Sequence, residues 1–164
     1  MLAPPPARGR EPRRAHAARG PHSRPAPVPI PMSEAIRRLA LNDGRYSPEA
    51  FRFLFESLGY AVRLAGKEDA EGPERHVTGK EVLVGMRACA RDLFGPLAAQ
   101  VWRSWGVHES LDWGRIVFLL VEAGMLKRQD EDRVEDFADG FDFDEAFVRD
   151  YRAELPRSTG GSTG

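Results

Sequence analysis

Residues 110–124, SLDWGRIVFLLVEAG, predict a helix that is apolar on almost all of its faces. This segment contains the longest apolar run of the chain, the six residues 116–121. A helix without a polar face is stable in water only when other elements cover it on several sides. The run is far shorter than the ~20 residues that cross a bilayer. We therefore expect a helical domain packed around this helix, and no membrane-spanning segment.

Amphipathic helices are predicted before and after this central helix. Ser47-Pro48-Glu49 is typical of a helix start, because serine caps free amides and proline fits the first helical position. Apolar residues then recur every three or four positions. Thr78 and Glu81 have the spacing of a capping box. The expected helices span about 33–41, 48–65, 79–94, 96–105, 110–123 and 144–151.

Residues 125–137 interrupt this helical pattern. Two short segments with apolar ends flank the acidic run 130–132, a pattern compatible with a small β-hairpin. The predicted fold is therefore mainly α: a compact domain of five to six helices, in which residues 125–137 have room for a small winged-helix-like β-hairpin.

The two ends of the chain differ in composition from its body. Residues 1–31 are dense in proline, glycine and arginine and contain no aromatic residue, so we expect a disordered leader. Helical patterning begins at Met32, so we take Met32 as the true start of the protein. Two alternatives are that residues 1–31 are a basic interaction arm or a targeting segment. The apolar stretch of a secretory signal is not present in them. Residues 32–155 form the expected domain, and residues 156–164 a flexible tail.

Charge is distributed unevenly along the chain. Six arginines and one acid give residues 1–31 a charge of +5, so the net charge of −1 leaves −6 for the remainder. An acidic body is repelled by phosphate backbones, which argues against nucleic-acid binding by the folded part. The single cysteine, Cys89, allows no internal disulfide, and a reducing cytoplasm is the expected location.

Recognisable catalytic and cofactor motifs are lacking in this sequence. It contains no phosphate-binding loop, dinucleotide-binding turn, nucleophile elbow or zinc-ligand spacing. His76 and His108 have no spacing that suggests a catalytic pair, and Cys89 lies mid-helix among small apolar residues. The acids of residues 130–145 do not match a calcium-binding loop. We predict no catalytic residue, no metal site and no cofactor.

Three tryptophans are the candidate binding residues. Trp102 and Trp105 are three positions apart and so share a helix face, and Trp113 belongs to the apolar helix. Burial in the core is the default expectation for such residues. The alternative is an exposed aromatic patch for a protein partner, because tryptophan is enriched at binding hot spots.

The C-terminal half resembles a winged helix-turn-helix. In that architecture a helix is followed by a glycine, two apolar residues and a β-wing, which here are Gly124, Met125, Leu126 and the expected hairpin. The resemblance implies a DNA-reading helix at 110–123. That helix is apolar where a recognition helix is polar or basic, and the candidate wing is acidic.

Residues 41–148 as a whole are similar to a conserved hypothetical family of planctomycete and verrucomicrobial bacteria. The stretches that carry the resemblance are 45–51 (RYSPEAF), 76–83 (HVTGKEVL), 94–98 (FGPLA), 105–107 (WGV), 112–118 (DWGRIVF), 121–126 (VEAGML), 135–137 (EDF) and 141–147 (FDFDEAF). The resemblance implies no activity and transfers no catalytic residue.

Three functions are compatible with these observations. The leading hypothesis is a non-enzymatic, cytoplasmic protein-interaction or adaptor domain that acts through Trp102, Trp105 and Trp113 on an unidentified protein partner. The first alternative is a winged-helix-like DNA-binding regulator, and the second is an enzyme in which His76, His108 or the acidic residues converge in one pocket.

Overall fold

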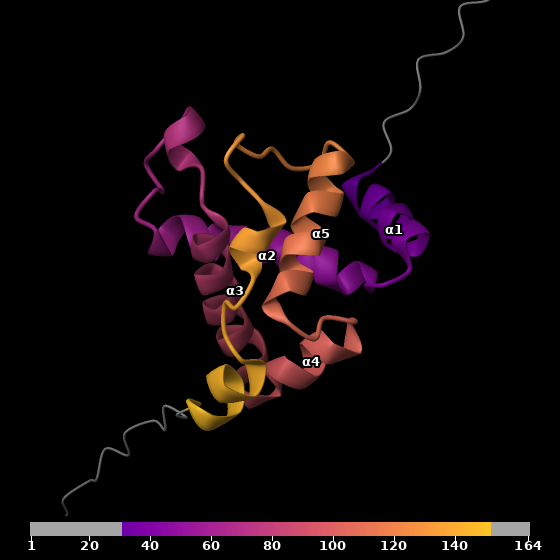
Figure 1. The fold of residues 1–164 in the computed structure, drawn as a ribbon, viewed down its shortest axis with the longest axis vertical. Helices are drawn as coiled ribbons and strands as arrows, with labels where there is room; N and C mark the ends of the chain where they lie inside the picture. The colour runs from indigo at the N-terminus through magenta and orange to yellow at the C-terminus, as the bar shows by residue number, and fades with distance from the viewer. Residues whose placement is uncertain (1–30, 152–164) are drawn as a thin grey trace, which may run out of the picture.

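The computed structural model describes residues 31–151 (Figure 1). The predicted tail and the predicted leader, apart from Pro31, lie outside these residues. The described part holds five α-helices and no β-strand: α1 (Met32–Asp43), α2 (Pro48–Leu64), α3 (Gly79–Phe94), α4 (Ala98–Ser104) and α5 (Ser110–Glu122). Short helical turns connect or follow them: η1 (Gly72–Arg75), η2 (Gly95–Leu97), η3 (Val134–Phe137) and the π-helical η4 (Glu145–Arg149). The prediction of a mainly α-helical fold with five to six helices is confirmed.

Local sequence signals explain where the helices begin and end. Helix α2 starts at Pro48, directly after Ser47, as expected. The Thr78–Glu81 capping box is formed in both directions at the start of α3. Gly44 follows α1 with a φ of 75°, a left-handed conformation that costs glycine little. Helix α5 begins at Ser110, as expected, and Glu109 is the residue that precedes its first turn.

Helix α5 runs through the middle of the molecule, between α1 on one side and α3 on the other, while α2 passes behind it (Figure 1). Helices α2 and α3 form the most extensive contact of the fold. They approach each other closely at Gly85, where an added Cβ would overlap the backbone nitrogen of Ala61. This position therefore requires glycine because of a close backbone approach. No helix within 31–151 is both long and apolar enough to cross a membrane.

A cluster of aromatic side chains fills the part of the core between α2, α4, α5 and η4. Trp102 of α4 packs edge-on against Trp113, Phe143 and Phe147, with ring centroids 4.9 to 5.0 Å apart. Phe53 of α2 lies 5.7 Å from the Trp102 ring and 5.5 Å from the Trp113 ring. Such edge-to-face pairs add to the free energy gained from burying apolar area. This cluster joins α2, α4, α5 and η4 into one core.

The β-hairpin considered for residues 125–137 is not formed. Residues 125–133 fold as turns and irregular chain, and residues 134–137 form the 3-10 turn η3. The physical reason is tertiary packing. Phe137 is 4% exposed and seated against α3 and α5, so η3 is held to the helices and has no strand partner.

Candidate functional site

An apolar groove of about 650 Å³ opens between α2, α5 and the two irregular segments 67–78 and 125–137. Eight of its 18 lining residues are valine, leucine or phenylalanine, and five others carry a charged side chain. The lining residues are Leu58, Val62, Gly72, Pro73, Arg75, His76, Val77, Gly79, Val82, Val117, Phe118, Leu126, Lys127, Arg128, Gln129, Asp132, Asp136 and Phe137. A concave, largely apolar site of this size with a few polar groups is typical of a binding site.

The groove is an open trough rather than an enclosed cavity. Of the lining residues, only Gly79, Val82 and Phe137 are buried. The apolar side chains of Val117 and Phe118 on α5 remain partly exposed to solvent. Covering such side chains on binding would remove apolar surface from water, which is the main source of affinity at protein interfaces.

Phe137 fixes the wall formed by residues 125–137. Its ring rests where two helices carry glycine: a Cβ at Gly79 would lie 2.9 Å from Cε2 of Phe137, and one at Gly114 would lie 2.9 Å from Cγ. Real Cβ atoms do not approach so closely, so both glycines are needed for the ring to sit between α3 and α5. The two glycines therefore determine how closely this wall approaches the helices.

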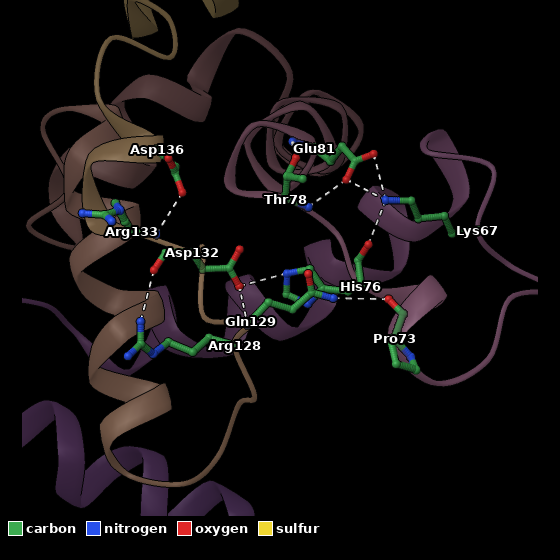
Figure 2. A network of polar contacts seen from close by, with 10 residues as sticks. All are labelled: Lys67, Pro73, His76, Thr78, Glu81, Arg128, Gln129, Asp132, Arg133 and Asp136. Atoms are coloured by element: carbon green, nitrogen blue, oxygen red, sulfur yellow. Dashed lines mark hydrogen bonds and ion pairs between the residues drawn. The ribbon is translucent and has the colours of Figure 1, made fainter.

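Lys67 holds the opposite wall against α3 (Figure 2). Its Nζ donates to the backbone carbonyl of His76 at 2.8 Å and to both carboxylate oxygens of Glu81 at 2.9 and 3.0 Å. The backbone N–H of Thr78 also donates to Glu81, at 2.7 Å. These hydrogen bonds hold the pKa of Glu81 below its usual range. The bond from the Thr78 backbone has the larger effect and the bond from Lys67 the next largest.

Side chains of the two walls contact each other, as Figure 2 shows. Nε2 of His76 lies 2.9 Å from Oδ2 of Asp132, and the Gln129 side-chain amide donates to the Pro73 carbonyl at 3.4 Å. The His76 ring N–H is not directed at the carboxylate, so the contact is an ion pair when His76 is protonated, and not a hydrogen bond. Asp132 also accepts from the backbone N–H of Gln129 at 2.7 Å, which closes the turn between them.

The structure buries two of the three tryptophans that were considered for partner binding. Trp102 and Trp113 are fully buried in the core, so neither can contact a partner on the surface. Trp105 is half-buried and packs against Phe53 and Phe94, with centroids 5.6 and 5.7 Å away. None of the three lines the groove. Trp102 and Trp113 therefore take the core position that was the default expectation, and the alternative of an exposed patch does not apply to them.

The other residues singled out from the sequence have structural positions. Cys89 is buried in α3, and burial raises the pKa of its thiol to about 11, so it is not an activated nucleophile. His108 is exposed and lies outside the groove. Within the part of the chain that the structure describes, no group of three or more histidine, cysteine and acidic side chains is placed to hold a metal ion.

Many acids of residues 130–145 cap turns or form ion pairs. Asp136 accepts from the Arg133 backbone at 2.9 Å at the start of η3, and Asp142 accepts from the Glu145 backbone at 2.8 Å before η4. Asp144 pairs with the Arg103 guanidinium through two hydrogen bonds of 2.8 and 2.9 Å. The acidic segment therefore organises its own irregular backbone.

Sequence reasoning named His76 but missed the groove in which it lies. His76 and Asp132 come from segments 56 positions apart, and no spacing rule connects them. The one local signal nearby is the Thr78–Glu81 capping box, which predicts where α3 begins but not what packs beside it. A scan of protein-family models, a search of curated proteins and a search of solved structures found no match to this chain.

Proposed function

We propose that this chain is a non-enzymatic protein-interaction domain that docks an apolar segment of a partner protein in the groove. The observation that carries the proposal is the open trough of about 650 Å³ lined by partly exposed apolar side chains. We place this activity in the cytoplasm as part of the proposal, because the only cysteine is a free, buried thiol.

Apolar side chains on two rigid helices support this proposal. Leu58 and Val62 project from α2, and Val117 and Phe118 from α5, one helical turn or less apart. Fully burying such a side chain contributes about 1.5 to 3 kcal/mol, so a few of them are sufficient to anchor a short segment. Because the walls are held by Lys67 and Phe137, the groove is formed before a partner arrives, which lowers the entropic cost of binding.

The chemistry of the lining favours binding over covalent catalysis. Among the described residues that line the groove, none carries a hydroxyl or a thiol, so the groove supplies no side-chain nucleophile of those kinds. Its one histidine, His76, has its Nε2 beside Asp132.

The decisive experiment selects peptides from a random library displayed on phage, using the full-length protein as bait. Each selected peptide is then measured by titration calorimetry against wild type, V117R and V84R. Val84 is the matched control, because it is an exposed valine on α3 that does not line the groove. We expect V117R to weaken binding at least about tenfold, which corresponds to about 1.4 kcal/mol, and V84R to leave it unchanged.

A second substitution guards against a folding defect in V117R. F118A removes a groove side chain without introducing a charge, and circular dichroism establishes that each variant is folded. Peptides that bind V117R and F118A as tightly as wild type overturn the proposal, as does a library that yields no groove-dependent peptide.

A general-base enzyme is the second candidate, because His76 and Asp132 do converge in the groove. An imidazole beside a carboxylate can activate a water molecule. The test compares hydrolysis of a panel of p-nitrophenyl esters by wild type and by H76Q. A rate that does not depend on His76 removes this candidate.

A further inference from the structure

Basic side chains from both irregular segments line the groove. Arg75 comes from η1, and Lys127 and Arg128 come from the segment that follows α5. All three are exposed. Within residues 31–151 none of them forms an ion pair with a carboxylate. Arg75 and Arg128 each donate only to a backbone carbonyl, that of Glu68 at 3.0 Å and that of Asp132 at 3.2 Å.

The two acids of the lining are already engaged by the protein itself. Asp132 accepts from the Gln129 backbone and lies against His76, and Asp136 accepts from the Arg133 backbone. An arginine has five N–H donors, so Arg75 and Arg128 keep most of theirs available. Three cations against two carboxylates give the lining residues a net charge of +1 with His76 counted as neutral, although residues 32–164 carry a net charge of −6.

Arg128 also brings this positive charge next to the apolar wall. Its guanidinium carbon lies 5.7 Å from the ring centroid of Phe118, a residue of the groove lining. A ligand that covers Phe118 with an apolar side chain would therefore place its neighbouring groups within reach of a cation. Arginine also binds carboxylates with two parallel hydrogen bonds, which favours a defined geometry.

We propose that the segment bound in the groove is acidic as well as apolar: a peptide of a partner protein in which aspartate or glutamate lies close to leucine, valine or phenylalanine. This inference rests on the proposed function and adds the charge of the partner to it. Charge complementarity selects the acidic residues. The groove is open and most of its lining residues are not buried. An open groove can hold a peptide whose chain continues beyond it at both ends, whereas a small amphiphilic molecule is better held in an enclosed cavity.

The test repeats the library selection with the full-length K127E/R128E variant. The matched control is R37E/R38E, which makes the same change of net charge at two adjacent exposed arginines of α1, outside the groove. Both variants keep the basic leader, so its attraction for acidic peptides cancels in the comparison. We expect wild type and R37E/R38E to select peptides enriched in acidic and apolar residues, and K127E/R128E to select basic and apolar ones.

Salt dependence gives a second, independent measure. The acidic peptides are expected to bind wild type about fivefold or more weakly at about 0.5 M salt than at about 0.05 M, because exposed ion pairs are screened. The neutral variant K127Q/R128Q removes the attraction without adding repulsion, and we expect it to lose most of this salt dependence. If K127E/R128E does not fold, K127Q/R128Q still tests whether the two cations contribute to peptide binding.

The possible failures of the two proposals are separable. Apolar peptides that depend on Val117 but show no acidic enrichment overturn this inference and leave the docking function intact. Peptides that do not depend on Val117 overturn both. Decanoate, a free carboxylate on an alkyl chain, is titrated in parallel: binding of decanoate without binding of any selected peptide overturns the assignment to a protein partner.

Discussion

The hydroxyl of Tyr46 donates a hydrogen bond of 2.7 Å to Oδ1 of Asp112, and so joins the turn before α2 to the first turn of α5. Asp112 is buried and also accepts from Arg115 and from the backbone N–H groups of His108 and Glu109. Burial alone would raise the pKa of Asp112, but these four donors outweigh it and hold the pKa below its usual range. For Tyr46, burial and the bond to Asp112 raise the pKa to about 12.

Substitution of Asp112 is predicted to destabilise the protein more than loss of its tyrosine partner. D112N places an amide N–H₂ among donors and is expected to lower the free energy of unfolding by about 2 to 3 kcal/mol. Y46F leaves Asp112 with three other donors and is expected to cost about 1 kcal/mol. Urea unfolding followed by circular dichroism measures both. Equal losses would show that the carboxylate does not act as the centre of this network.

Acid is predicted to destabilise wild type more than D112N. Because the pKa of Asp112 is lower in the folded than in the unfolded protein, the carboxylate contributes stability above its unfolded pKa. That contribution is lost as the pH falls below about 4 and through the folded pKa. Unfolding free energies measured from neutral pH to about pH 3 should therefore fall more steeply for wild type. Parallel curves for the two proteins would contradict the low pKa of Asp112.

Two glycines in neighbouring helices are predicted to respond in opposite directions to alanine. At Gly85 a Cβ would overlap the Ala61 backbone, so G85A should cost at least about 2 kcal/mol by pushing α2 and α3 apart. At Gly59 of α2 nothing lies within 4 Å of the added Cβ, so G59A should stabilise by up to about 1 kcal/mol. Thermal unfolding of both variants provides the measurement. A G85A protein as stable as wild type would rule out the close crossing of α2 and α3.

Phe137 is predicted to support both the fold and the groove. F137A removes a nearly buried ring from its seat on Gly79 and Gly114, and should cost about 3 kcal/mol. The same change removes one groove wall, so binding of groove-dependent peptides should be lost even where the variant is folded. L64A is the control, because Leu64 is an exposed apolar residue outside the groove and should change neither property. Retained peptide binding by folded F137A would contradict this placement of the wall.

The helical part of the fold is predictable because its signals are local. The apolar spacing of residues 48–65 and the Thr78–Glu81 capping box act within a few positions of each other, and both were recovered in the structure. The error at 125–137 has the opposite cause. The short segments with apolar ends on either side of residues 130–132 are compatible with a hairpin, but the position of Phe137 depends on Gly79 and Gly114, which are distant in the sequence.

The groove was not predictable for the same reason. Its walls come from two segments that are distant in the sequence, and contacts such as His76–Asp132 and Gln129–Pro73 join residues 56 positions apart. Individual charged residues in loops are normal on any protein surface, so neither the pair nor the cations of the lining stand out in a single sequence. Only the tertiary arrangement shows which loop residues share a site.

The positions of the tryptophans determine which events change the intrinsic fluorescence of this protein. All three lie within the described residues, two of them are fully buried, and none lines the groove. Intrinsic fluorescence should therefore shift to longer wavelength when the core opens to water, yet change little when the groove is filled. Optical detection of binding at this site requires a reporter placed elsewhere, for example a single tryptophan introduced at Leu126.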